Sequence, residues 1–256
     1  MGVSQYQTSF VLTVAESKRL IAKGVAKSPA VQGALEKGIV AVAKGTTNAY
    51  VVEELTGQAM HKPHYCTGTT RPQKAQSTVD VANKLPDLVL RRGQRWEGTS
   101  AVEAVAEMKA GDVFIKGANA LNYDLGQAAI LIGHPTGGTI GAALGALVAR
   151  RVTLLIPVGL EKSVPGDLYE VARQLAEAGE GGSGPTLWPV EGEIFTELEA
   201  LKVLCGVEAC AIGAGGILGA EGSVRIAVWG SGDQLHQAER LLEAVHGEPP
   251  FGSDTR

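Results

Sequence analysis

The chain has 256 residues, of which 45% are hydrophobic and 20% charged, and its formal net charge is −4 at pH 7. The composition is that of a globular protein, and the lack of a basic cluster or a run of about 20 apolar residues argues against a nucleic-acid partner and a membrane helix. The 3 cysteines are scattered and imply no disulfide framework, and no signal-peptide pattern is present. We therefore expect a cytoplasmic protein that contacts neither nucleic acid nor membrane.

The first part of the chain alternates predicted strands and helices. Residues 6–14 alternate β-formers and predict a strand, and residues 16–37 predict a helix interrupted at Ser28-Pro29, because proline favours the first turn of a new helix. A short apolar strand at 38–43 ends in a polar turn that leads into another helix. Residues 57–86 are polar and aperiodic, so we interpret them as a long loop of the kind that often forms a lid.

The middle of the chain predicts a βαβ unit. An apolar strand at 128–133 runs into the loop HPTGGT, a helix of small residues follows at 140–151, and a second apolar strand covers 152–158. Ligands bind such units at the carboxyl ends of their strands. The sequence therefore predicts a small-molecule site where these strands end.

A linker of glycine, serine and proline at residues 180–185 marks a change of pattern. Beyond it the order strand, helix, strand, strand, helix predicts a ferredoxin-like βαββα domain at residues 184–256. Residues 213–222 are rich in glycine but join two strands, so we interpret them as a hairpin loop and not as a nucleotide loop. A larger α/β domain would then cover residues 1–183.

Three segments of this larger domain together carry a family resemblance: EKGIVAVAKGTTNAYVVEEL, DVFIKGANAL and LIGHPTGGTIG, the last followed by VTLLIPVGLEKSVPGDLYEV. In this order they resemble the Rossmann-like superfamily of ribose-5-phosphate isomerases, glucosamine-6-phosphate deaminases, CoA transferases and lactate-utilisation (LUD) proteins. The resemblance covers residues 16–178. It implies an α/β fold with a mainly parallel sheet and helices on both of its faces.

The chain also departs from this superfamily. Its sugar-phosphate isomerases carry acidic residues after the middle strand, where this chain has the segment KGAN at 116–119. They also place a catalytic glutamate after the later glycine loop, where this chain has only small apolar residues. These departures argue against a plain ribose-phosphate isomerase, and likewise against a CoA transferase with its glutamate nucleophile.

Two turns are candidates for holding an anion. In the first, Thr46, Thr47 and Asn48 begin a helix, where N–H groups and hydroxyls bind anions, although these residue types also favour helix N-caps for structural reasons. In the second, glycines allow a close backbone approach and threonines offer hydroxyl groups. The ligand-binding candidates of this second loop are Thr136, Gly137, Gly138 and Thr139.

Single side chains near the predicted strand ends could also bind the ligand. Lys116 would neutralise an anion, or else form a salt bridge with Glu161. Asn119 could bond a ligand hydroxyl or shape its own turn. Arg71, in the long loop, could reach over the site as a clamp. The group His61, His64 and Cys66 lacks a fourth partner at zinc-site spacing, so we expect no metal.

Glu161 and Lys162 are the strongest pair for chemistry. A carboxylate can act as base or nucleophile, and a neighbouring cation tunes its pKa. The alternative is a pair that caps the next helix. His134 is the second catalytic candidate, because the imidazole pKa lies near neutrality; otherwise it is a half-buried histidine that satisfies a carbonyl.

The sequence thus predicts a protein that binds a small phosphorylated or carboxylated metabolite, as an isomerase, transferase or hydrolase, without a bound cofactor. A non-catalytic metabolite sensor or regulatory subunit is the first alternative, and the missing acidic residues would suit it. The second alternative is an oligomeric assembly protein. For it, the alternating segment 224–229 would form an interface edge. We expect a homo-oligomer.

Overall fold

The computed structural model describes residues 6–68, 70, 74, 84–179 and 182–253. Its largest sheet has six strands in the order β10-β8-β5-β2-β3-β4. The strands are β2 (Ile39–Val42), β3 (Leu88–Arg91), β4 (Gln94–Arg95), β5 (Val113–Ile115), β8 (Thr153–Pro157) and β10 (Glu193–Phe195). Neighbours among β2, β5, β8 and β10 are parallel, whereas β3 and β4 form an antiparallel hairpin at one side. The chain is therefore a mixed α/β protein.

The parallel strands are short, apolar and buried. β2 and β5 are buried at every position, as expected for strands that are covered on both faces. The register pairs Val42 with Ile115 and Ile115 with Leu155, so the carboxyl ends of these strands lie at one edge of the sheet. β10 extends this edge, since its Phe195 pairs with Pro157.

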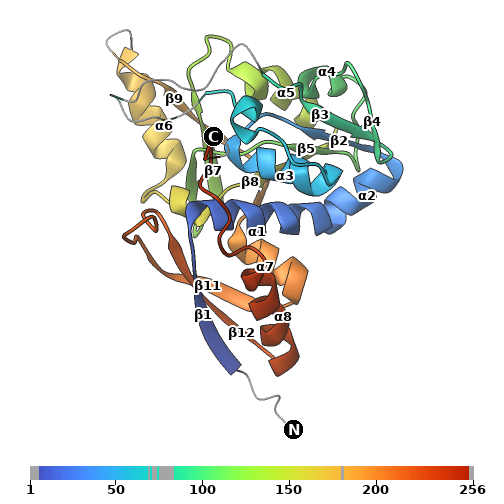
Figure 1. The fold of residues 1–256 in the computed structure, drawn as a ribbon. Coiled ribbons are helices and arrows are strands. Elements are labelled where there is room, and N and C mark those ends of the chain that lie inside the picture. The colour runs from blue at the N-terminus through green and yellow to red at the C-terminus, as the bar shows by residue number, and fades with distance from the viewer. Residues whose placement is uncertain (1–5, 69, 71–73, 75–83, 180–181, 254–256) are drawn as a thin grey trace.

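Helices lie above and below this sheet in Figure 1. Below it are α1 (Val14–Lys27) and α2 (Pro29–Lys37), and above it are α4 (Ala101–Ala104) and α5 (Gly138–Ala149). α1 also packs against α3 (Thr46–Thr56). The predicted break between α1 and α2 is confirmed, with Pro29 in the first turn of α2, but the Ser28 hydroxyl donates to Val25 O and does not cap the new helix.

A second sheet has the order β6-β7-β9 and is antiparallel. Its strands are β6 (Ala120–Asn122), β7 (Gln127–Ile132) and β9 (Thr186–Val190), and α6 (Leu168–Glu177) packs on it. The expected parallel pairing of 128–133 with 152–158 is therefore wrong. The reason is local: a tight turn, in which Gly126 has φ +62° and donates to Tyr123 O, folds β7 back onto β6.

A third sheet, β1-β12-β11, joins the beginning of the chain to its end. β1 (Tyr6–Leu12) pairs along its full length with β12 (Val224–Gly230), and β11 (Glu208–Ala214) flanks the other side of β12. α7 (Glu197–Cys205) and α8 (Gly232–Glu243) cover this sheet, and α7 also packs against α1. Figure 1 shows these elements as the smaller lower part of the molecule.

The pairing of strands crosses residue 183, where we expected a domain boundary. β9 joins β7 and β10 joins β8, so both strands that follow the linker belong to sheets built from earlier residues. The βαββα order after residue 184 therefore does not form one sheet. β11 and β12 do form the antiparallel pair expected around the glycine-rich loop. β12 is a central strand with Val224, Ile226 and Val228 buried, so it is not an interface edge.

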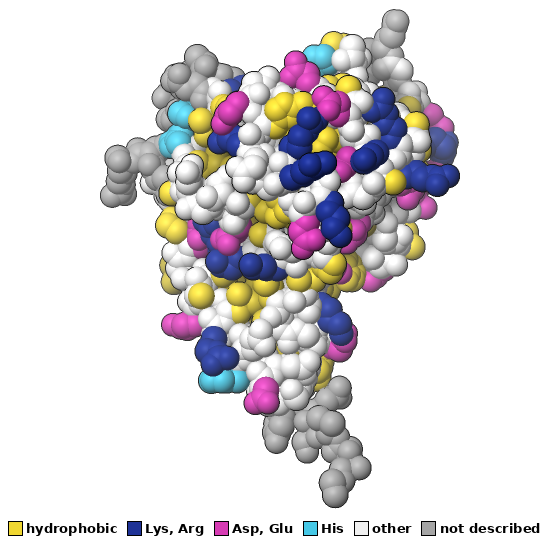
Figure 2. Space-filling view, turned by 90° about the vertical axis from the view of Figure 1, so that its right-hand side faces the viewer, with side chains coloured by type: hydrophobic (Ala, Val, Ile, Leu, Met, Phe, Trp, Pro, Cys, Tyr) yellow, Lys and Arg dark blue, Asp and Glu magenta, His cyan; other side chains and the backbone are white. Residues whose placement is uncertain are grey.

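The basic run at residues 91–95 spans the β3–β4 hairpin, and two of its three arginines form ion pairs. Arg91 pairs with Glu107 and stacks 3.6 Å over the Trp96 ring, and Arg95 pairs with Glu97. Figure 2 shows Lys and Arg side chains interspersed with Asp and Glu on the face that it presents. Within the described residues, no helix combines the length and apolar character that crossing a membrane requires.

Candidate functional site

Four chain segments meet where the parallel strands end. β2 leads into the turn before α3, β5 into Lys116, β8 into the short 3₁₀ helix η3 (Leu160–Lys162), and β10 into α7. α1 packs against α3 and α7, beside this edge. These segments bring together three lysines and two glutamates, which we call the sheet-edge cluster: Lys18, Lys116, Glu161, Lys162 and Glu197.

Lys116 and Lys162 are neighbours in this cluster. Burial lowers the pKa of both lysines, and the charge of Lys162 lowers the pKa of Lys116 further, to about 8. Lys162 Nζ donates to Ala118 O at 2.9 Å, whereas the acceptor of Lys116 Nζ among the described residues is Gly117 O, at 3.3 Å. No ion pair joins Lys116 to Glu161 among the described residues, so the expected salt bridge does not form.

Glu161 folds back over the turn that follows β8. Its carboxylate packs against Gly159, and its Oε2 is buried without a hydrogen-bond donor in the described part of the chain. Glu161 acts electrostatically on Lys18 and Lys162. It does not cap the next helix, because Asp167 accepts the hydrogen bonds at the start of α6. Glu161 is thus a half-buried residue with one buried carboxylate oxygen that is free to accept a hydrogen bond near two ammonium groups.

Glu197 completes the cluster from the first turn of α7. It is 0% exposed, and both carboxylate oxygens accept from the backbone N–H of Leu160, at 3.0 and 3.3 Å. Burial and the charge of Glu161 raise the pKa of Glu197 to about 7. The sequence analysis did not single out Glu197, which lies in the first turn of a helix that begins with a capping box of Thr196 and Glu199.

Lys18 is the second residue that sequence reasoning missed. It lies on α1, is 7% exposed, and interacts with Glu161 and Lys162. Burial lowers its pKa more than Glu161 raises it. The helical spacing in the sequence could have indicated its burial. Lys18 shares the apolar stripe of α1 with Ile21, Ala22 and Val25, at spacings of three, four and seven residues. A lysine on a buried stripe has to find a polar partner.

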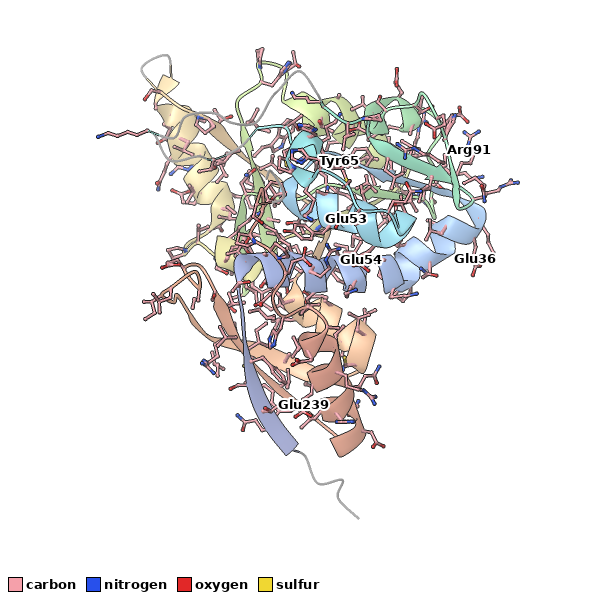
Figure 3. The ribbon with its side chains drawn as sticks, viewed as in Figure 1. Glu36, Glu53, Glu54, Tyr65, Arg91 and Glu239 are labelled. Atoms are coloured by element: carbon pink, nitrogen blue, oxygen red, sulfur yellow. The ribbon has the colours of Figure 1, made fainter. Side chains whose placement is uncertain are left out.

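An ion network next to Lys18 holds α1 in place. Arg19 donates to Glu53 at 2.5 Å and Glu54 at 3.0 Å, both on α3, and to Glu248 at 2.9 Å near the end of the described chain. Figure 3 labels Glu53 and Glu54, which lie between α3 and α1. These hydrogen bonds, with the Arg19 guanidinium stacked 4.8 Å from the Tyr50 ring, fix the helix that carries Lys18.

The turn at Thr46, Thr47 and Asn48 lies beside the cluster but is largely internal. Asn48 is 0% exposed and its Nδ2 donates to Ala43 O at 2.7 Å and Ile115 O at 3.3 Å, which joins the ends of β2 and β5. Thr47 is 2% exposed, while Thr46 is half-buried. Asn48 is therefore a structural residue, and Thr46 is the member of this turn that a ligand can reach.

The loop after β7 lies on a separate groove of about 690 Å³. Its walls come from residues 132–137, Gly184 and residues 186–188, with Trp188 packed against Gly137, and no residue of the sheet-edge cluster lines it. His134 is exposed and its Nδ1 lies 3.2 Å from the Thr136 N–H. His134 is thus not a half-buried residue that satisfies a carbonyl. Gly138 and Thr139 form the first turn of α5.

The remaining candidates stand apart from the cluster. Asn119 is exposed, and its Oδ1 accepts from Leu131 N at 3.0 Å, which ties β7 to the turn before β6. Arg71 lies outside the described residues. No group of three or more His, Cys, Asp or Glu that could hold a metal ion occurs in the described part of the chain. Burial raises the pKa of Cys66, a neighbour of Lys18, to about 11, so its thiol is neutral at pH 7.

Searches with protein-family models, against curated proteins and against solved structures matched nothing to this chain. The chemistry of the sheet-edge cluster therefore has to be argued from its own residues.

Proposed function

We propose that the chain binds a small anionic metabolite, phosphorylated or carboxylated, at the carboxyl edge of its parallel strands. The observation that carries the proposal is a charge imbalance. Three lysines converge in the cluster, and the carboxylates that act on them are Glu161 and Glu197. Even with both carboxylates ionised the cluster keeps a positive excess, and a buried uncompensated charge is costly. An anion would remove that cost.

Neighbouring residues support this assignment. Lys44, at the end of β2, is already paired with Asp87 at 3.1 Å, so it is not part of the excess. Thr46 offers a hydroxyl and the first N–H groups of α3 beside the cluster. We further infer a Rossmann-like arrangement for the parallel part of the fold, because β2, β5, β8 and β10 are parallel neighbours in the sheet and each connection between them contains a helix.

We propose that the reaction, if one follows binding, is an isomerisation, transfer or hydrolysis in which Glu161 handles the proton. The buried Oε2 of Glu161 has no donor among the described residues, so it is available as an acceptor. His134 lies on the separate groove, and none of the cluster's carboxylates lines that groove. This geometry favours Glu161 over His134 as the proton-handling residue.

Isothermal titration calorimetry with phosphorylated and carboxylated metabolites tests the binding. The replacement Lys162→Met should weaken binding of the best anion by at least about tenfold, which is the effect expected for a lost charge-assisted bond. Lys109→Met, at an exposed lysine outside the cluster, is the matched control and should leave the affinity unchanged. Equal affinities for Lys162→Met and wild type would contradict the proposed site.

NMR spectra of each bound compound, recorded during incubation with the protein, separate the enzyme from the sensor. Glu161→Gln should keep binding and lose turnover if Glu161 moves a proton. Binding without any turnover in wild type would favour the metabolite sensor.

A further inference from the structure

The three lysines of the sheet-edge cluster have different surroundings. Lys162 is bonded to Ala118 O and is attracted by Glu161 and Glu197, and Lys18 is attracted by Glu161. Among the described residues, Lys116 has no acceptor as close as Ala118 O and no carboxylate that attracts it. The charge that acts on Lys116 is the like charge of Lys162, and its contact at 3.3 Å with Gly117 O is weak. Lys116 is thus the amine whose ammonium form this cluster stabilises least.

We propose that Lys116 forms an imine with the carbonyl group of a small anionic aldehyde or ketone, such as a 2-oxo acid, that is bound at the sheet edge. This inference rests on the proposed anion site and names the class of its substrate. The nitrogen must be unprotonated and reachable, and Lys116, which directly follows β5, is only partly buried. Lys162 and Lys18 would hold the carboxylate or phosphate of the same molecule.

The environment of Lys116 keeps part of its amine neutral, and the neutral amine is the nucleophile. With a pKa of about 8, roughly a tenth of the amine is neutral at pH 7, whereas an ordinary lysine has well under a thousandth in that form. A desolvated lysine next to a second cation is a known way to activate an amine for imine formation. Lys162 is that second cation here.

The reaction balances without any further reagent. The Lys116 nitrogen attacks the carbonyl carbon, a C–N bond forms, and the carbonyl oxygen becomes a hydroxyl group. That hydroxyl then leaves as water and a C=N bond remains. The nitrogen loses two protons in all, and both leave with the oxygen. Solvent or the Glu161 carboxylate of the same cluster can carry them.

Reductive trapping tests the proposal. The full-length protein is incubated with pyruvate or glyoxylate in the presence of cyanoborohydride, and the adducts are located by peptide mass spectrometry. We expect one main adduct per chain, at Lys116. Lys116→Arg and Lys116→Met should both lose it, and Lys109→Arg should keep it. Because the adduct is mapped in wild type, the test stands even if a variant folds poorly. Adducts spread over exposed lysines without an excess at Lys116 would overturn the proposal.

A parallel calorimetric titration with lactate and inorganic phosphate, which lack a carbonyl group, separates the two hypotheses. If an anion binds wild type but no adduct forms at Lys116, imine formation is wrong and the anion site stands. If neither anion binds and no adduct forms, both are wrong. An adduct at Lys116 that excess lactate suppresses would support both.

Discussion

The carboxylate of Glu161 occupies the space that a side chain on residue 159 would need. A Cβ on Gly159 would overlap Glu161 Oε2 and would lie 2.7 Å from its Cδ. The backbone of Gly159 is ordinary, with φ −78° and ψ 149°, so the turn itself does not require glycine. Glycine is present at 159 because it lets the Glu161 side chain fold back into the cluster.

Gly159→Ala should therefore displace the Glu161 carboxylate. We expect the free energy of unfolding to fall by about 1 kcal/mol or less when measured by urea denaturation, because the atoms that must move are the far end of a flexible side chain. The matched control is Gly33→Ala on α2, where a new Cβ meets no atom within 4 Å. That control should be neutral or stabilising by up to about 1 kcal/mol. Equal stability of Gly159→Ala and wild type would show that Glu161 moves aside without cost.

The edge of the parallel sheet could be predicted from sequence because it depends on local pattern. Short apolar runs that end in polar residues placed Lys116, Glu161 and Lys162 at strand ends, and the structure puts them there. Lys18 and Glu197 come from a helix interior and a helix start, and they reach the cluster only through the packing of α1 and α7. That packing depends on the tertiary fold, and the sequence pattern of the individual strands does not predict it.

The predicted parallel pairing of β7 with β8 was wrong for a different reason. Its pattern of a strand, a glycine loop and a helix is shared by parallel crossovers and by antiparallel strands that a helix follows. The turn ending at Gly126 decides between them, because a two-strand hairpin forms more readily than a crossover. The segment NYDLG before β7 carried this signal. The pairing of β1 with β12, far apart in the sequence, had no such local signal.

Glu197→Gln should change the pH dependence of stability. The pKa of Glu197 is raised from 4.5 to about 7 in the folded chain, so the folded state holds its proton more tightly than the unfolded state. Wild type therefore loses stability as the pH rises from about 4.5 to about 7, by an amount on the order of 3 kcal/mol. The glutamine variant does not titrate. Its stability relative to wild type should rise between pH 5 and pH 8, roughly across this window, as measured by urea denaturation.

Glu199→Gln, in the capping box of the same helix, is a useful comparison, because glutamine can fill that position of a capping box. Because this variant keeps Glu197, its stability should still fall as the pH rises across the same window. A parallel pH profile for Glu197→Gln and wild type would show that Glu197 titrates normally.

Lys162→Met should raise the pKa of Lys116. The variant removes the like charge that lowers this pKa, while desolvation by burial remains, so the shift should be partial and the pKa should stay below its ordinary value of 10.5. Methylation of the lysines with ¹³C-formaldehyde followed by an NMR titration measures each amine separately. Lys109→Met serves as the control and should leave Lys116 unchanged. An unaltered pKa of Lys116 in Lys162→Met would mean that burial alone lowers it.

Asn48→Ala and Asn119→Ala should differ in stability, although the sequence offered both residues as ligand contacts. Asn48 is fully buried and donates to Ala43 O and Ile115 O, so its loss removes a donor from both carbonyl groups, of which Ile115 O keeps the N–H of Ala43. We expect a cost of about 2–3 kcal/mol for Asn48→Ala. Asn119 is exposed and water can replace it at the N–H of Leu131, so Asn119→Ala should cost about 1 kcal/mol or less. Urea denaturation of the two variants measures this difference, and equal costs would mean that the Asn48 bonds do not hold the ends of β2 and β5 together.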